Sequence, residues 1–329
     1  CVFTRNNEKW VYKILKSATI SYNKSIIEKL SSAFVTSGLE LTKLDYDYGR
    51  WIGIQIKEFL SDIEIKPDFI ASHGHTIYHR PNEGFTLQIG KGSAIAAESG
   101  LPCICDFRSS DVCHSGQGAP LVPIGDRYLF SDYDICLNLG GFANLSYEHY
   151  NSRLAFDIGP CNIILNSIAQ EMGYTFDNDG NIGRKGIVNE SLLNKLNVLD
   201  YYKKSAPKSL GREWIEEIFA PIIKEYSISS EDKLTTLYEH IATQISSATN
   251  SIHGKRILVT GGGAHNSLLI HLLQNKSNHS IVTPDNKTID YKEALIFAFL
   301  GILFTQNHPG ALASVTGAKR DSISGCLYF

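Results

Sequence analysis

The glycine pair at residues 140–141 constrains the fold more than any other short stretch, because it separates two apolar runs. Residues 135–139 form the first run, and residues 142–147 resume an alternating apolar pattern. We therefore predict a β-hairpin with the glycines in its turn, where their positive φ suits a tight connection. A glycine turn also leaves backbone N–H groups uncovered, which favours an anion such as a phosphate. The alternative is a turn whose glycines serve packing alone.

A carboxylate follows this hairpin closely. Asp157 stands after an apolar residue and before Ile158-Gly159-Pro160, where we expect a strand to end. Beside a phosphate site, an aspartate can take the proton of the attacking hydroxyl in a kinase. The same side chain could instead cap the helix that we predict over residues 162–171. The pattern thus leaves a catalytic base and a structural cap as the two interpretations.

Length and composition narrow the class of protein. A chain of 329 residues can bury a large core and is long enough for two lobes. Hydrophobic residues at 43% and charged residues at 20% are ordinary for a soluble globular protein. The formal net charge of -3 argues against a nucleic-acid surface, and no apolar run approaches the roughly 20 residues of a membrane span. Seven cysteines without zinc-site spacing favour reduced thiols in a cytoplasmic protein.

Three histidines follow a predicted strand over residues 69–72. They are His73, His75 and His79, and their closeness invites a metal site. No cysteine or carboxylate nearby completes such a site, and the glycine at position 74 indicates a turn. We therefore predict no metal site here.

A second strand, predicted over residues 102–106, delivers Asp106 and Arg108 at its carboxyl end. Open α/β sheets place their ligands at the carboxyl ends of strands. These two side chains are therefore candidates for a binding or catalytic site.

Another glycine-rich turn joins a strand predicted over residues 256–260 to a helix predicted over residues 267–274. Three consecutive glycines bring backbone close to a ligand at a helix N-terminus, which indicates a nucleotide. Asn266 stands where the dinucleotide fingerprint requires its third glycine, so the loop is not of the Rossmann type. A tight β-α connection without a ligand is the alternative.

A series of sequence blocks, in order from residue 72 to the C-terminus, resembles the anhydro-N-acetylmuramic acid kinases of the sugar kinase/Hsp70/actin superfamily. The most specific block is Gly-Gln-Gly-Ala-Pro-Leu-Val-Pro at residues 116–123. The others are residues 72–76, 85–90, 106–108, 137–146, 157–162, 207–213, 261–266, 293–298 and 314–318.

The resemblance implies an α/β chain with a two-lobed actin-like ATPase (ribonuclease H-like) fold, in which central mixed sheets are flanked by helices. The first lobe would span residues 1–130 on the sugar-binding side. The second would span residues 131–329 on the nucleotide-binding side, with the extreme C-terminus packing back on the first lobe. The polar stretch at residues 124–134 would mark the boundary.

The resemblance also implies an activity. An ATP-dependent kinase, with Mg²⁺, would open the 1,6-anhydro ring of anhydro-N-acetylmuramic acid with water and phosphorylate O6, in peptidoglycan recycling. Its partner would be this small amino sugar, with neither nucleic acid nor membrane, and a homodimer is compatible with the resemblance.

The resemblance assigns roles to particular residues. Asp106 resembles the general base that activates the water, whereas Asp157 resembles a position near the sugar and competes for the same role. Positions resembling substrate contacts are Thr86, Arg108, His73 and Glu293. Positions resembling nucleotide contacts are Asn138, Gly140, Gly141, Asn144, Gly261, Gly262, Gly263 and Asn266.

The chain departs from the family pattern in places. His75 replaces a usual glutamine, Cys161 replaces a frequent glycine, and a first phosphate loop, Ser-Gly-Thr-Ser-x-Asp-Gly, is expected just before Cys1. We expect a sequence truncated at its N-terminus, and a poor catalyst as written. The rival hypothesis is a noncatalytic ligand-binding paralogue; retention of Asp106 and Arg108 favours the enzyme. Another sugar kinase of the superfamily is disfavoured by residues 116–123.

Overall fold

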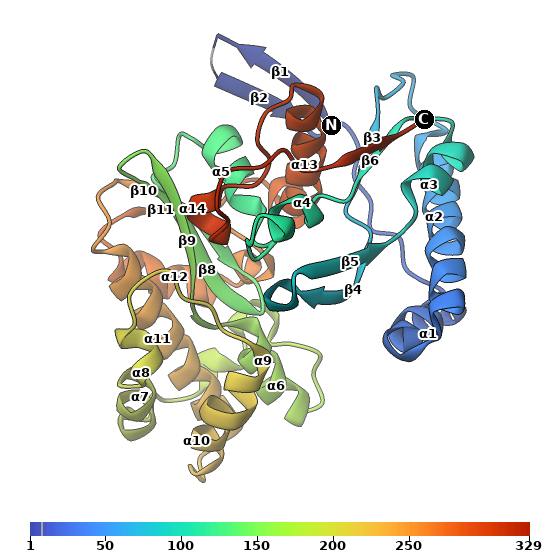
Figure 1. The fold of residues 1–329 in the computed structure, drawn as a ribbon. Helices are drawn as coiled ribbons and strands as arrows, with labels where there is room; N and C mark the ends of the chain where they lie inside the picture. Colours follow the sequence, from blue (N-terminus) through green and yellow to red (C-terminus); the bar gives the residue numbers. More distant parts are fainter. Residues whose placement is uncertain (8) are drawn as a thin grey trace. The chain divides into compact units, whose positions relative to one another are not determined.

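The computed structural model describes residues 1–7 and 9–329. The chain forms two compact units, which we call the first unit (Cys1–Gly125 with Glu293–Phe329) and the second unit (Asp126–Lys292). The chain leaves the first unit within α5 (Val122–Leu129) and returns to it within α13 (Asn286–Thr305) (Figure 1). Among the described residues, no helix is long and apolar enough to span a membrane.

The two units divide the chain differently from the predicted lobes. The predicted second lobe ran from residue 131 to the C-terminus, with the extreme C-terminus packing back on the first lobe; in the structure the segment that belongs to the first unit is residues 293–329. The predicted boundary stretch, residues 124–134, contains the observed boundary between Gly125 and Asp126. The chain crosses this boundary within helix α5. Its Ile124 is buried and its Gly125 lies against Ile296 of α13, so helix packing excludes an open connection here.

The second unit contains a five-stranded mixed sheet in the order β11-β10-β7-β8-β9. Strands β7, β8 and β9 form an antiparallel meander, while β10 and β11 run parallel to β7. This order and polarity are those of the ribonuclease H-like fold, and they confirm the predicted mixed sheet. The bounds are Ile135–Leu139 (β7), Phe142–His149 (β8), Ser152–Pro160 (β9), Arg256–Thr260 (β10) and Ser280–Val282 (β11).

Helices pack on this sheet around α11 (Ser230–Thr249). Its buried Leu234, Leu237, Ile241 and Ile245 recur every three or four residues, which gives the helix one apolar face. The central strand β7 buries its side chains on both faces, as a strand covered on both sides does. Other helices of this unit are α6 (Asn162–Glu171), α7 (Glu190–Asn197), α8 (Asp200–Lys203), α9 (Arg212–Trp214), α10 (Ala220–Lys224) and α12 (Ser267–Lys276).

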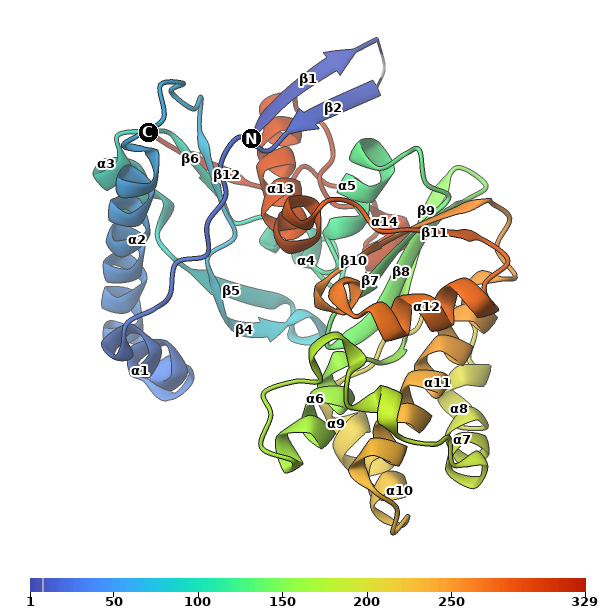
Figure 2. The same cartoon turned by 180° about the vertical axis from the view of Figure 1, so that it is seen from behind.

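The first unit holds a three-stranded sheet in the order β12-β6-β3, in which the C-terminal strand β12 runs beside β6 (Figure 2). Two antiparallel ribbons, β1-β2 and β4-β5, complete its strands. The bounds are Val2–Asn6 (β1), Lys9–Lys13 (β2), Ile70–Ser72 (β3), His75–Arg80 (β4), Phe85–Ile89 (β5), Cys103–Cys105 (β6) and Cys326–Tyr328 (β12).

Close helix packing organises this unit. The long helix α2 carries Gly49 and Gly53, one turn apart. A Cβ at Gly49 would lie 2.7 Å from the carbonyl oxygen of Lys91, and one at Gly53 would lie 2.9 Å from that of Ile95. Both glycines therefore let α2 approach α3. The helices here are α1 (Lys24–Ser32), α2 (Gly38–Leu60), α3 (Gly92–Ser99), α4 (Ser109–Cys113) and α14 (Ala313–Thr316).

Candidate active site

A pocket of about 170 Å³ opens in the first unit and gathers three predicted site residues, Asp106, His73 and Thr86. Strands β3, β5 and β6 deliver most of its wall, and the C-terminal Tyr328 closes part of it. Further lining residues, for which no role was predicted, are Asp45, Gln88, Lys91, Cys105 and Ser109.

Asp106 follows β6 directly, as predicted, and turns the chain with a φ of 60°. This left-handed conformation is uncommon for a residue with a side chain, although aspartate tolerates it better than most. Its Oδ1 accepts a hydrogen bond from the Ser109 N–H at 3.3 Å. The turn thus places the carboxylate on the pocket wall rather than along the strand.

Arg108 is held by two hydrogen bonds within the same unit. Its Nε donates to His73 Nε2 at 2.8 Å, and its Nη1 donates to the Gly118 carbonyl at 2.6 Å. Because His73 Nε2 accepts, its proton lies on Nδ1, which is 3.0 Å from the carbonyl oxygen of Gly74. Burial, together with the positive Arg108, lowers the pKa of His73 to about 4, so the imidazole is neutral at pH 7. His73 therefore orients Arg108 by accepting the hydrogen bond from its Nε–H.

Glu293 acts on the same guanidinium through its charge. Burial lowers the pKa of Arg108, whereas the Glu293 carboxylate raises it. The two predicted substrate residues are therefore electrostatic neighbours although 185 positions separate them in sequence.

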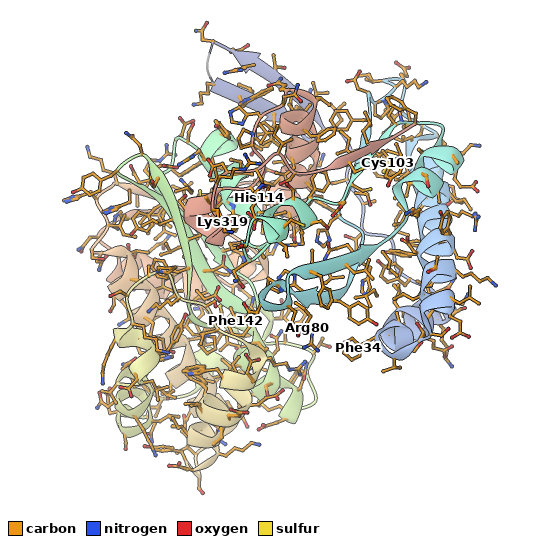
Figure 3. The ribbon with its side chains drawn as sticks, viewed as in Figure 1. Phe34, Arg80, Cys103, His114, Phe142 and Lys319 are labelled. Atoms are coloured by element: carbon orange, nitrogen blue, oxygen red, sulfur yellow. The ribbon has the colours of Figure 1, made fainter. Side chains whose placement is uncertain are left out.

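Thr86 is already engaged within the β4-β5 ribbon, whose strand β4 ends at Arg80, labelled in Figure 3. Its hydroxyl donates to the Tyr78 carbonyl at 3.2 Å and accepts from Gln88 Nε2 at 2.8 Å. His79 Nδ1 lies 3.1 Å from the same oxygen. Since the only proton of the hydroxyl is used, Thr86 can offer a ligand only an acceptor.

A buried carboxylate that the sequence pattern missed anchors the glycine-rich loop. Asp111 is fully buried, and its Oδ2 accepts from the Gly118 N–H at 2.7 Å. Its Oδ1 accepts from the Thr316 hydroxyl at 2.7 Å. A Cβ at Gly116 would lie 2.1 Å from Asp111 Oδ2, so only glycine fits there. Asp111 thereby fixes the loop whose Gly118 carbonyl orients Arg108.

In the second unit, neighbouring strands bring the other predicted residues together. Asn138 is the partner of Asn144 across β7-β8, and Asn144 is the partner of Asp157 across β8-β9. Thr260, just before the three glycines, is the partner of Asn138 across β10-β7. Directly opposed residues share a face of the sheet, so these side chains form one row.

The predicted hairpin is present, but its turn differs from the expected one. Neither Gly140 nor Gly141 adopts a positive φ, so the prediction of a turn built on positive φ is wrong. The turn is held instead by the start of α6: Cys161 N–H donates to the Gly141 carbonyl at 2.8 Å, and Asn162 N–H to the Gly140 carbonyl at 3.1 Å. Asn162 Nδ2 also donates to the Leu139 carbonyl at 2.9 Å.

The glycines of this region divide into two groups. A Cβ at Gly261 would lie 2.5 Å from Asn138 Oδ1, and one at Gly263 would lie 2.7 Å from Leu139 Cβ, so both serve packing. At Gly141 and Gly262 the nearest atom would be 3.8 Å away, and neither has a positive φ. Packing does not explain these two glycines, whereas the close approach of a phosphate or nucleotide would. The residues present therefore fit a nucleotide.

Asp157 lies inside β9 and not at a strand exit, because β9 continues to Pro160. Its Oδ2 accepts from the Leu210 N–H at 2.9 Å, which ties the loop before α9 to the strand. It does not cap α6, whose first residue follows Cys161 without a side-chain cap, so that structural interpretation is wrong. Burial raises the pKa of Asp157, which the Leu210 hydrogen bond partly opposes. A partly buried carboxyl with a raised pKa is a candidate proton acceptor.

The side chain of Asn266 is used inside the protein. Its Oδ1 accepts from the Leu269 N–H at 3.1 Å and caps α12, and its Nδ2 donates to the Tyr238 hydroxyl at 2.8 Å. Tyr238 in turn donates to Asp177 Oδ2 at 3.1 Å. Both polar atoms of the Asn266 side chain are thus engaged within the protein, where they hold the start of α12.

Within residues 1–7 and 9–329, no group of three or more histidine, cysteine, aspartate or glutamate side chains could hold a metal ion. His73 accepts a hydrogen bond from Arg108, and His79 Nδ1 lies within hydrogen-bond distance of the Thr86 hydroxyl.

Comparison with known proteins decides the family. A family model for anhydro-N-acetylmuramic acid kinase matches residues 5–329. The anhydro-N-acetylmuramic acid kinase of Shewanella pealeana is 33% identical over 335 residues, covering 96% of this chain and 91% of the relative. This chain belongs to the anhydro-N-acetylmuramic acid kinase family. The relative of the same name from Haemophilus influenzae is 37% identical, and the match covers 88% of this chain and 83% of the relative.

Likeness to solved structures is weaker. The activator of the 2-hydroxyisocaproyl-CoA dehydratase from Clostridium difficile, with bound ADPNP, is 16% identical with a TM-score of 0.37. The match covers 68% of this chain and 87% of the activator. Such a likeness carries no argument about ligands.

Membership of the anhydro-N-acetylmuramic acid kinase family confirms the resemblance on which the residue roles depend. The family match does not test those roles one by one. The roles of Asp106, Asp157 and the other named side chains therefore stay predictions.

Proposed function

We propose that this chain catalyses ATP-dependent opening and phosphorylation of 1,6-anhydro-N-acetylmuramic acid. Water would open the anhydro ring and ATP would phosphorylate O6, giving N-acetylmuramic acid 6-phosphate and ADP. The observation that carries this proposal is the family match over residues 5–329, which includes every predicted site residue. It favours the kinase over a noncatalytic paralogue, since the matched relatives are named as kinases and the chain covers most of their length.

The proton acceptor of the proposed reaction is Asp106. Its carboxylate lies on the wall of the first unit's pocket, and the left-handed backbone conformation of Asp106 turns it toward that pocket. Its role would be to take a proton from the water as the water attacks the ring. Asp157 remains the alternative base, because burial raises its pKa and it lies among the predicted nucleotide residues.

Arg108 would bind the sugar through its carboxylate or ring oxygens. A guanidinium fork suits a planar anion, and here its orientation is set by His73 and Gly118 before any ligand arrives. A pre-oriented group loses less conformational freedom on binding, which favours affinity.

ATP would approach the open glycines Gly141 and Gly262, where backbone N–H groups can meet phosphate oxygens. Mg²⁺, when bound, would neutralise charge on the transferred phosphoryl group. Such an ion usually keeps several waters and takes one or two carboxylates besides the phosphates. The lack of an acidic cluster among the described residues is compatible with that mode.

The test is release of ADP from ATP that depends on the anhydro sugar. Asp106→Asn should retain binding of sugar and ATP in calorimetry, but turn over about a hundred- to ten-thousand-fold more slowly. Asp68→Asn, an exposed aspartate of the same unit, is the matched control and should keep full activity. The chain extended upstream through a Ser-Gly-Thr-Ser-x-Asp-Gly segment should be assayed beside it.

Two results would contradict the proposal. Tight binding of sugar and nucleotide without turnover by either length of chain would make the protein a binder. A loss below about tenfold for Asp106→Asn, with Asp157→Asn nearly inactive, would exchange the roles of the two carboxylates.

A further inference from the structure

Three cysteines gather on two neighbouring strands of the first unit's three-stranded sheet. Cys103 and Cys105 lie on β6, and Cys326 lies on the C-terminal strand β12; Cys103 is labelled in Figure 3. All three are free thiols, with Cys103 buried and Cys326 exposed. Neither the family match nor the proposed reaction gives them a role.

Strand register places two of these thiols opposite each other. Cys326 is the direct partner of Cys105 in the antiparallel β12-β6 pair, and Tyr328 is the partner of Cys103. Directly opposed residues point to the same face, and their Cα atoms lie roughly 4.5 to 5.5 Å apart in any antiparallel pair. A disulfide needs Cα atoms roughly 4.4 to 6.8 Å apart, so the register alone permits one.

Contacts at Gly92 show which face the thiols occupy. A Cβ at Gly92, the first residue of α3, would lie 2.6 Å from Cys105 Sγ and 2.6 Å from the Tyr328 ring. Cys105 also lines the pocket that contains Asp106. Cys105 of the opposed pair therefore lies beside the proposed catalytic residue Asp106.

The two thiols differ in character. A hydrogen bond from the Cys103 thiol lowers the pKa of Cys105, and the Gly92 N–H and Lys91 act in the same direction against burial and Asp106. A lower pKa increases the thiolate fraction, which is the attacking form in disulfide exchange. Cys326 is the more accessible of the pair.

We propose that Cys105 and Cys326 form a reversible redox pair, which closes into a cross-strand disulfide when the protein meets a small disulfide such as oxidised glutathione. The Cys326 thiolate attacks one glutathione sulfur, forms a mixed disulfide and releases one glutathione thiol. The Cys105 thiolate then attacks the Cys326 sulfur and releases the second. Two protein thiols lose two electrons and two protons, and one glutathione disulfide becomes two thiols.

The disulfide would tie the terminal strand to β6. β12 is three residues long and lies at the edge of its sheet, so it is expected to open locally in the reduced protein. The link would restrict that opening.

The experiment uses the full chain, fully reduced and then incubated with oxidised glutathione. We expect the loss of two alkylatable thiols per molecule, a peptide pair joined through Cys105 and Cys326 under non-reducing conditions, and complete reversal by dithiothreitol. Hydrogen exchange of residues 326–328 should be slower in the oxidised protein. Cys113→Ser, which removes another exposed thiol of this unit, should still form the link.

Cys326→Ser supplies the second arm. This variant should lose the linked pair while its Cys105 remains alkylatable. A glutathione adduct that persists on Cys326 of the unmodified chain, or a link from Cys326 to any other cysteine or to a second molecule, would overturn the proposal. Unchanged exchange at residues 326–328 in the linked protein would overturn the proposed effect on the strand.

Discussion

A buried ion pair in the second unit offers the sharpest test of the energetics. Lys292 Nζ lies 2.7 Å from Asp126 Oδ1, and the two side chains are only 8% and 5% exposed. Removing one partner of a buried pair leaves an uncompensated charge, which typically costs about 3 to 5 kcal/mol of stability. Lys292→Met keeps the length of the side chain and removes its charge.

Two other groups near Asp126 limit the loss of stability. Arg153 Nη2 lies 3.9 Å from Asp126 Oδ2, and the Ser146 hydroxyl donates to that oxygen at 2.5 Å. They continue to stabilise the carboxylate after Lys292 is gone. We therefore expect the free energy of unfolding to fall by about 3 kcal/mol, at the lower end of the range for buried pairs.

The assay is equilibrium urea unfolding, with Lys195→Met as the matched control. Lys195 pairs with Glu225, but these side chains are 43% and 56% exposed, so its loss should cost less than about 1 kcal/mol. Adding Asp126→Asn to Lys292→Met should recover at least about 1 kcal/mol, because the carboxylate left without its partner is removed. If Lys292→Met costs no more than Lys195→Met, or if the second substitution adds its own loss, the reasoning about this pair is refuted.

The pair also has a predicted pH dependence. Burial is the largest single effect and lowers the pKa of Lys292, but the Asp126 carboxylate together with Cys136 outweighs it and raises the pKa above the ordinary 10.5. Stabilisation by Lys292 is therefore complete below pH 10.5 and is lost as pH rises through the folded-state value. Lys292→Met should flatten the alkaline part of the stability profile.

Further predictions concern the two candidate binding regions and acid stability. Arg108→Lys should raise KM for the sugar more than KM for ATP, and unchanged sugar affinity in calorimetry would remove Arg108 from the site. Tyr238→Phe leaves the Asn266 amide without its acceptor, so it should cost about 1 to 3 kcal/mol and raise KM for ATP but not for the sugar; equal effects on both would count against it. Burial lowers the pKa of His240 to about 3. As pH falls, the unfolded chain therefore protonates this histidine before the folded chain does, and stability decreases below the ordinary pKa of 6.5. The loss from pH 7 to 5 should be about 2 kcal/mol and smaller in His240→Gln, as measured by urea unfolding at both pH values.

Local sequence patterns determined the elements that carry the candidate site. The strand over residues 256–260 and the helix over residues 162–171 have their predicted bounds, and Asp106 follows a strand as expected. These features depend on apolar periodicity and on glycine or proline at the ends of elements, which act over a few residues. The residue blocks that resemble the kinase family are of the same short-range kind.

Only the tertiary structure decided which distant segments meet. Asp111 is held by Thr316, 205 positions away, and Cys105 faces Cys326, because the chain returns to the first unit within α13. Asp157 lies within a strand because pairing with β8 extends β9 to Pro160, past the glycine that indicated its end. Hydrogen bonding across strands and burial of a shared core select such partners, and neither leaves a signal within the short stretch of sequence around each residue.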